Sequence, residues 1–173
     1  ELADALQKEG KILGVAIHPK TGEGKPEEAN GSQAQDLKRL AQAADQLYFM
    51  TYLENGTFSE AGPPGSLPWM RRVMEYAIND VGIPRQKAFL GIGLMGVEWD
   101  KDEDGLTTGN REDVTFTQVQ EIINGNGAKI QWDENSQTPF FEFQQEDGTH
   151  VLWFENQRSI TQRVQLAKDL DLG

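Results

Sequence analysis

Alternating apolar and polar segments divide the first half of the chain into strands and helices. Three apolar runs are typical of buried strands, and they span residues 11–17, 47–52 and 88–94. Apolar residues at helical spacing predict two intervening helices, over residues 37–44 and 67–78. Strands that alternate with helices favour parallel, right-handed crossovers. The expected fold class is therefore α/β.

Short polar signals predict where the helices begin. Ser32 with Gln35, and Ser159 with Gln162, have the spacing of a capping box. Ser66 can cap the helix that follows it. We therefore expect helices to open directly after these three serines.

The apolar run at residues 47–52 is the strand of most functional interest. Its unbroken apolar character predicts burial on both faces. Strand periodicity places Tyr48, Met50 and Tyr52 on one face. Ligands of parallel α/β proteins bind at the carboxyl ends of the strands. Met50 and Tyr52 are therefore candidate ligand contacts.

The pattern changes after residue 99. Residues 100–113 are acidic and have the composition of a loop, and a short helix is expected over residues 116–123. Three strands are predicted after it, over residues 128–133, 139–145 and 150–154. This pattern indicates an α+β insertion at residues 100–154, carried by βα units at residues 1–99 and 155–173.

Composition and charge narrow the range of partners. The 173 residues suffice for one domain and include 28 acidic against 16 basic residues, for a net charge of −12. Nucleic acid and anionic membranes are therefore unfavourable partners. The chain has no cysteine, which excludes disulfides and thiolate chemistry. No apolar run is long enough to span a membrane, and no signal peptide is visible.

Four segments resemble a known family when taken in order. They are F-M-T-Y at 49–52, P-W-M-R-R-V-M-E-Y-A at 68–77, L-G-I-G-L-M-G-V-E-W at 90–99 and H-V-L-W-F-E-N-Q-R-S at 150–159. Their order and spacing resemble glycoside hydrolase family 18, in particular the branch of spore-cortex and cell-wall N-acetylglucosaminidases and chitinase-like proteins. The resemblance implies the C-terminal half of a TIM (β/α)8 barrel, with a small α+β insertion after the seventh strand.

The resemblance also implies a reaction. Family members hydrolyse β-linked N-acetylglucosamine polymers, such as peptidoglycan or chitin, with the substrate's acetamido group as nucleophile and without a cofactor. The family's acid-bearing signature, D-x-x-D-x-D-x-E, does not occur in this sequence. We therefore expect hydrolysis only in an intact parent that is secreted or associated with the cell envelope or spore. A non-catalytic carbohydrate-binding or interaction module is the alternative.

Two site positions carry over from the family's M-x-Y-D motif. The resemblance implies that Tyr52 donates a hydrogen bond to the acetamido oxygen, as a catalytic residue, and that Met50 lines the floor of that sugar subsite. Leu53 stands where the motif has aspartate, and Met95 stands where an aromatic residue commonly follows strand seven. These departures favour the binding-only alternative.

Other polar and aromatic residues allow two interpretations each. Glu54 could bind a sugar hydroxyl or be a solvated loop charge, and Trp99 could stack on a sugar or belong to the insertion's core. The three remaining tryptophans, Trp69, Trp132 and Trp153, are expected to be structural.

A metal site has weak support. Asp100, Asp102, Asp104 and Gly105 match the start of an EF-hand loop, but the twelfth position is Arg111, with Glu112 one residue late. An exposed acidic loop is the alternative to calcium binding. His18 and His150 lack a second ligand at helical spacing, so no metal is expected.

A partial barrel would leave strand edges without partners. The runs at residues 11–17 and 88–94 are the expected edges. Unpaired edges are templates for another chain, so we expect self-association through them.

Overall fold

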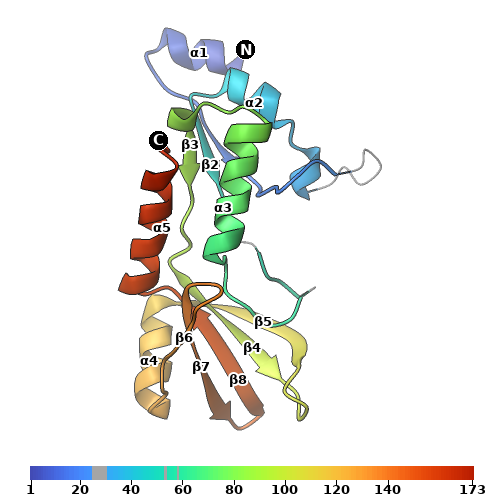
Figure 1. Ribbon diagram of the computed structural model, residues 1–173, viewed down its shortest axis with the longest axis vertical. Helices are drawn as coiled ribbons and strands as arrows, with labels where there is room; N and C mark the ends of the chain where they lie inside the picture. Colours follow the sequence, from blue (N-terminus) through green and yellow to red (C-terminus); the bar gives the residue numbers. More distant parts are fainter. Residues whose placement is uncertain (25–30, 53, 58) are drawn as a thin grey trace. The chain divides into compact units, whose positions relative to one another are not determined.

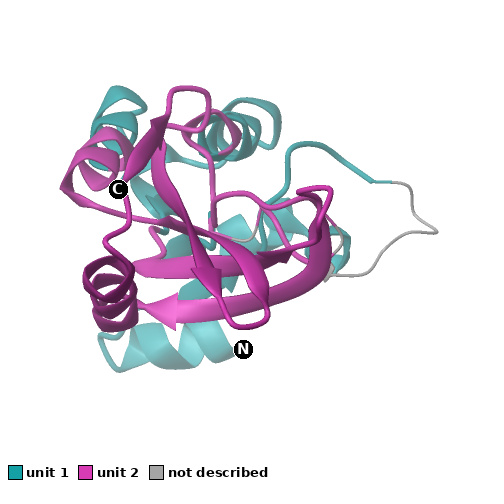
Figure 2. Cartoon of the chain, turned by 90° about the horizontal axis from the view of Figure 1, so that it is seen from below, with its two compact units in different colours: residues 1–51, 70–91, 164–173 teal, residues 52–69, 92–163 magenta. Residues whose placement is uncertain are grey.

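The computed structural model describes the chain from residue 1 to residue 173, except residues 25–30, 53 and 58. It divides into two compact units, which Figure 2 colours separately. Unit 1 comprises Glu1–Thr51, Met70–Gly91 and Val164–Gly173. Unit 2 comprises Tyr52–Trp69 and Ile92–Arg163.

A three-stranded parallel sheet forms the centre of unit 1 (Figure 1). Its order is β1 (Gly14–Ile17), β2 (Gln46–Phe49), β3 (Ala88–Leu90), and each strand lies within a predicted apolar run except for Gln46. Phe49 at the end of β2 pairs with Ile17 on one side and Leu90 on the other. The predicted parallel α/β arrangement is thereby confirmed.

Strand β2 is shorter and less enclosed than its apolar sequence predicts. Leu47 and Phe49 are buried, but Tyr48 is 43% exposed and lies beside Phe89, with 5.0 Å between the ring centroids. Burial on both faces is therefore wrong for β2. The tyrosine ring packs beside Phe89 while its hydroxyl donates to Gln46 Oε1, which a hydropathy pattern does not reveal.

Helices follow each of the first two strands. They are α2 (Leu37–Ala43) and α3 (Leu67–Glu75), the latter continued by the wider turns of η3 (Tyr76–Asp80). Met70, Val73 and Met74 form the buried face of α3, in agreement with the predicted helix. The shorter elements of unit 1 are α1 (Leu2–Lys8), η2 (Gly31–Ala34) and η4 (Arg85–Lys87).

The start of α2 differs from the predicted capping box. Asp36 is the N-cap, and its carboxylate accepts a hydrogen bond of 3.1 Å from Arg39 N. Gln35 instead accepts from His18 N at 2.8 Å, just beyond β1. The Ser32–Gln35 prediction is wrong because a contact distant in sequence engages Gln35. The predicted Ser66 cap is confirmed, since its Oγ accepts from Trp69 N at 3.3 Å.

Unit 2 is built on a five-stranded antiparallel sheet with the order β5-β4-β8-β7-β6. The strands are β4 (Met95–Lys101), β5 (Thr107–Thr115), β6 (Gln131–Asp133), β7 (Thr138–Gln145) and β8 (Gly148–Phe154). The last three, with helix α4 (Phe116–Asn126), fall within or near the predicted elements. The insertion boundaries at residues 100–154 remain a prediction, while the sheet itself begins at Met95.

The loop predicted over residues 100–113 is wrong. Most of this segment forms a hairpin in which Glu98 of β4 pairs with Glu112 of β5. Strand β5 lies at the edge of the sheet and exposes most of its polar side chains. Because edge strands tolerate charged residues, their sequences lack the apolar signal of buried strands.

Helix α4 covers one face of the sheet in unit 2. Val119 of α4 belongs to the core of that face, together with Val114, Phe141, Phe143, Leu152 and Phe154. The opposite face carries a second core of Val97, Trp99 and Val151. Thr115 and Gln118 form a capping box at the start of α4. The two faces of this sheet therefore have separate apolar cores.

Helix α5 (Gln157–Asp169) begins earlier than predicted. Asn156 Oδ1 accepts from Ser159 N at 3.0 Å, and Ser159 Oγ accepts from Asn156 N at 2.8 Å. Asn156 therefore acts as the cap and Ser159 as its reciprocal partner, so the predicted Ser159–Gln162 box is wrong. The side-chain oxygen of asparagine, like that of serine, can accept a hydrogen bond from a backbone N–H of the first helical turn.

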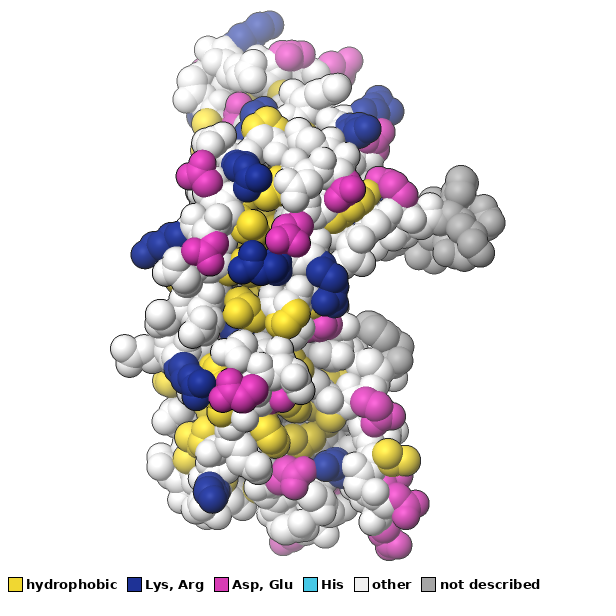
Figure 3. Space-filling model, viewed as in Figure 1, with side chains coloured by type: hydrophobic (Ala, Val, Ile, Leu, Met, Phe, Trp, Pro, Cys, Tyr) yellow, Lys and Arg dark blue, Asp and Glu magenta, His cyan; other side chains and the backbone are white. Residues whose placement is uncertain are grey.

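Acidic and basic side chains are interspersed on the face drawn in Figure 3. The net charge of −12 therefore does not collect into one acidic patch on this face. Within the described ranges, the helices are too short or too polar to cross a bilayer.

Candidate functional site

The carboxyl ends of the three parallel strands are tied together within unit 1. Met50 N donates to Ile17 O at 2.9 Å, and Gly91 N donates to Phe49 O at 2.8 Å. Thr51 is fully buried, and its hydroxyl donates to Gly91 O at 2.6 Å. These bonds place half-buried Met50 at the end of the sheet where parallel α/β proteins meet ligands.

Tyr52 belongs to unit 2 and lies in a turn rather than in the strand. Because β2 ends at Phe49, strand periodicity does not assign Tyr52 to the face of Met50. The half-buried Tyr52 side chain instead packs against Gly93, where an added Cβ would lie 2.7 Å from Tyr52 Cβ. Gly93 therefore makes the space for this side chain. Leu53 lies outside the described residues.

Glu54 holds the segment that precedes α3. Its Oε2 accepts from Ser66 N at 2.5 Å, and its Oε1 accepts from the Ser66 hydroxyl at 3.0 Å. Both oxygens therefore already have donors. A sugar hydroxyl would have to share or replace these bonds.

Trp99 has no accessible face in this structure. The side chain is fully buried on the face of the sheet opposite to α4, and its Nε1 donates to Gly62 O at 3.2 Å. Sugar stacking needs an open aromatic face, so the burial of Trp99 favours the core interpretation. Trp132 and Trp153 have protein partners too, Arg158 over the former at 3.7 Å and Phe140 beside the latter at 4.6 Å.

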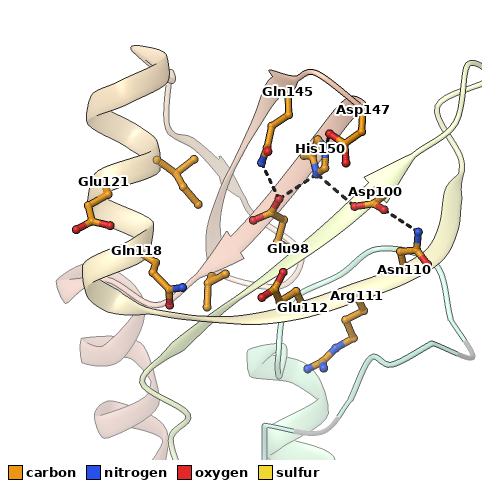
Figure 4. Close-up of a pocket in the computed structure, with 12 residues that line it drawn as sticks. Glu98, Asp100, Asn110, Arg111, Glu112, Gln118, Glu121, Gln145, Asp147 and His150 are labelled. Carbon is orange, nitrogen blue, oxygen red and sulfur yellow. Dashed lines mark hydrogen bonds and ion pairs between the residues drawn. The ribbon is translucent and has the colours of Figure 1, made fainter.

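A polar cavity of about 520 Å³ lies in unit 2 between α4 and the sheet (Figure 4). His150 is 4% exposed at its wall. Its Nδ1 lies 2.9 Å from Glu98 Oε1 and 3.2 Å from Asp100 Oδ1, and its Nε2 lies 3.0 Å from Asp147 Oδ1. Three carboxylates thus surround one imidazole.

Sequence spacing did not reveal this cluster. Asp100 and His150 are direct partners in the pairing of β4 with β8, and Asp147 follows from the β7–β8 turn. Sheet pairing brings together residues that are about fifty positions apart. The only local signal is the alternation of Glu98 and Asp100, which places both on one face of a strand.

The cluster perturbs its own carboxylates. Burial raises the pKa of Glu98, while the nearby His150 opposes this rise. The hydrogen bond with His150 lowers the pKa of Asp147. The arrangement therefore joins two strands and a turn through the contacts of one imidazole with three carboxylates.

The structure gives the calcium alternative no support. Asp100 contacts His150 and accepts from Asn110 Nδ2 at 2.8 Å, while Asp102 Oδ1 accepts from Asp104 N at 3.0 Å and Leu106 N at 2.9 Å. Among the residues that the structure describes, no three metal-type ligands gather in a suitable group.

A buried ion pair also lies in unit 2. Arg163 is fully buried, and its Nε and Nη2 lie 3.1 and 3.0 Å from Glu155 Oε1. Further bonds join Arg163 to Gln137 O, Thr138 Oγ1 and Gly65 O. Burial raises the pKa of Glu155 and lowers that of Arg163, and each partner opposes the shift of the other. This pair connects three separate segments of the unit.

Comparison with known proteins decides the family. The model of "Glycosyl hydrolases family 18" matches residues 1–173. The chain belongs to this family. The α/β fold is therefore a part of a TIM-barrel-like domain, as the four sequence segments indicated.

Similar proteins include spore cortex-lytic enzymes and a chitinase. The chain is 32% identical to the cortical fragment-lytic enzyme of Bacillus subtilis (strain 168), over 99% of this chain and 39% of that protein. A chitinase from Chromobacterium violaceum ATCC 12472 superposes with a TM-score of 0.84 at 27% identity, over 99% of this chain and 51% of the other. The spore cortex-lytic enzyme SleL of Bacillus megaterium QM B1551 gives 0.80 at 28% identity, over 98% and 38%. The chain thus spans about two fifths of the Bacillus subtilis enzyme and at most about half of the two proteins of known structure.

Proposed function

We propose that this chain is the C-terminal portion of a family 18 glycoside hydrolase domain that acts on β-linked N-acetylglucosamine polymers. Peptidoglycan and chitin are the substrates that fit this class. The proposal is carried by the family match over the whole chain, in which Met50 and Tyr52 follow a parallel strand's carboxyl end. The similarity to a cortical fragment-lytic enzyme and to a chitinase supports the same class of substrate.

In this proposal Tyr52 positions the nucleophile. Its hydroxyl donates to the acetamido oxygen of the substrate, which then attacks the anomeric carbon as the glycosidic bond breaks. Met50 contributes an adaptable apolar surface beneath the same sugar. The proton for the leaving group comes from a carboxylic acid outside these 173 residues, because the acid-bearing signature does not occur among them.

A non-catalytic carbohydrate-binding module is the second candidate. Leu53 cannot supply the carboxylate of the family motif, and Met95 replaces an aromatic residue. Glu54 is engaged by Ser66, so it does not substitute for the missing carboxylate in this structure.

A chromogenic N-acetylglucosaminide assay on the intact parent protein separates the two candidates. We expect turnover by the wild type and a loss of about 100-fold in kcat for Tyr52→Phe, because one preorganised donor is removed. Tyr48→Phe is the matched control, since that exposed tyrosine lies on β2 and outside the proposed site. Glycan binding without turnover by the wild type would instead establish the binding module.

We also propose a location in the spore or cell envelope, or secretion. The name of the Bacillus subtilis relative, a cortical fragment-lytic enzyme, supports this assignment. Cell fractionation with an antibody against the chain tests it, and recovery in the cytoplasmic fraction alone would contradict it.

A further inference from the structure

Glu54, two positions after Tyr52, attaches the chain to the segment that precedes α3. Its backbone N donates to Pro64 O at 2.9 Å. Its carboxylate accepts from Ser66 N at 2.5 Å and from the Ser66 hydroxyl at 3.0 Å. Hydrogen bonds to a carboxylate are stronger than those between neutral groups. The carboxylate of Glu54 should therefore dominate this attachment.

The segment that Glu54 binds is itself held in place. Ser66 caps α3, because its Oγ accepts from Trp69 N at 3.3 Å. Gly65 O accepts from Nη2 of the fully buried Arg163 at 3.2 Å. Burial lowers the pKa of Arg163, and the negative charge of Glu54 is among those that oppose this shift. A helix cap and a buried arginine thus fix the residues to which Glu54 is bonded.

Tyr52 has a second fixed contact at Gly93. A Cβ added at residue 93 would lie 2.7 Å from Tyr52 Cβ, so the two residues are tightly packed. On the other side, two residues of chain span at most about 7 Å, so the attachment at Glu54 is close to Tyr52. Tyr52 therefore lies between a close packing contact and a hydrogen-bonded anchor, which together limit the movement of its side chain.

We propose that Glu54 is a positioning residue for Tyr52: its carboxylate fixes the turn from which Tyr52 presents its hydroxyl to the acetamido oxygen of the substrate. The inference rests on the proposed function, because the position of Tyr52 matters to the reaction only if its hydroxyl meets the substrate. A displacement of about 1 Å can lower a rate by about 100-fold. In this role Glu54 contributes to the reaction without contacting the sugar.

Fluorine NMR on the full chain tests the position of Tyr52 without any substrate. The chain has three tyrosines, so labelling with 3-fluorotyrosine gives three resonances, which single substitutions to phenylalanine assign. Glu54→Ala should shift the Tyr52 resonance by more than its linewidth, because both carboxylate acceptors are lost, and should leave that of Tyr48 in place. Glu60→Ala is the matched control, an exposed glutamate near Glu54 in sequence, and should move none of the three. An unmoved Tyr52 resonance in Glu54→Ala would overturn the proposal.

Kinetics of the intact parent test whether this position matters to the reaction. With a chromogenic N-acetylglucosaminide, Glu54→Ala should lower kcat about tenfold and leave KM within about twofold, whereas Glu60→Ala should change neither. In a Tyr52→Phe background, Glu54→Ala should have almost no further effect, because the group that it positions is already missing. A second tenfold loss in that background would mean that Glu54 acts independently of Tyr52, contrary to the proposal.

Milder variants keep the test decisive if Glu54→Ala does not fold. Glu54→Gln retains one oxygen acceptor for Ser66 N, so it should shift the Tyr52 resonance and lower kcat less than Glu54→Ala. Ser66→Ala removes the hydroxyl donor, while Ser66→Thr retains a hydroxyl, so only Ser66→Ala should move the Tyr52 resonance. Identical Tyr52 resonances in the wild type, Glu54→Gln and Ser66→Ala would contradict the positioning role.

The two measurements also separate this inference from the proposed function. If the wild-type parent shows no turnover, the proposed function fails. The Tyr52 resonance then still shows whether Glu54 holds the tyrosine in place. If the parent is active but the resonance does not respond to Glu54, the hydrolase assignment stands and the positioning role is wrong.

Discussion

Arg163 and Glu155 form an ion pair inside unit 2, with Nη2 3.0 Å from Oε1 and both side chains almost completely excluded from solvent. Removing one member of such a pair leaves an uncompensated charge in the interior. Arg163→Met should therefore lower the free energy of unfolding by about 3–5 kcal/mol, as measured by urea denaturation. The control Arg158→Met, at an exposed pair with Glu134, should cost less than about 1 kcal/mol. Equal losses would refute the structural role of Arg163.

His150 should stabilise the sheet of unit 2 through its three carboxylate neighbours. His150→Gln removes the imidazole contacts with Glu98, Asp100 and Asp147 and should cost about 1–3 kcal/mol of unfolding free energy, because it leaves buried polar groups without a partner. The exposed His18 offers a matched control, and His18→Gln should change stability by less than about 0.5 kcal/mol. Urea denaturation at neutral pH measures both. If His150→Gln leaves the free energy of unfolding unchanged, the cluster does not contribute to the stability of the fold.

Glu98 should make stability depend on pH. Its pKa in the folded protein lies above the ordinary value of 4.5, chiefly because of burial. Above about pH 4.5 the folded state therefore binds more protons than the unfolded state. The free energy of unfolding falls as the pH rises through this range. Glu98→Gln should flatten this fall above about pH 4.5, measured by urea denaturation.

The exposed Glu146 provides the control for this titration. Glu146→Gln should keep the wild-type pH dependence. An unchanged slope in Glu98→Gln would show that another group is responsible.

Gly93 should be required for the position of Tyr52. A Cβ at residue 93 would lie 2.7 Å from Tyr52 Cβ, so Gly93→Ala should displace the tyrosine and cost about 1–3 kcal/mol. Near-ultraviolet circular dichroism and urea denaturation measure the two effects. Gly125 in α4 has open space around it, and Gly125→Ala should instead stabilise the protein by about 0.5–1 kcal/mol. If Gly93→Ala is equally benign, the close approach to Tyr52 is incorrect.

The edges of the parallel sheet should mediate self-association of this chain. β1 and β3 are the outer strands of the order β1-β2-β3, so each has one side without a strand partner in that sheet. We expect light scattering to show concentration-dependent dimers or larger species. Val15→Lys, which places a charge on β1, should reduce this association. Strictly monomeric behaviour of the wild type at high concentration would contradict the prediction.

The sequence by itself determined the family, the parallel strands and most helices, because those features depend on local apolar periodicity and on motifs such as F-M-T-Y at 49–52. It did not reveal the polar edge strand β5, whose side chains lie mostly in solvent and carry no apolar signal. It also placed the caps of α2 and α5 incorrectly, since Gln35 and Ser159 are engaged by His18 and Asn156.

The candidate sites were decided mainly by tertiary structure. Resemblance pointed to Met50 and Tyr52, but only the fold showed that Glu54 is engaged by Ser66 and that Trp99 is enclosed in the core. The His150 cluster depends on strand pairing between residues far apart in sequence, and Arg163 bonds to a residue as distant as Gly65. Burial and charge pairing at such positions are properties of the assembled interior, and a linear pattern of residue types does not specify them.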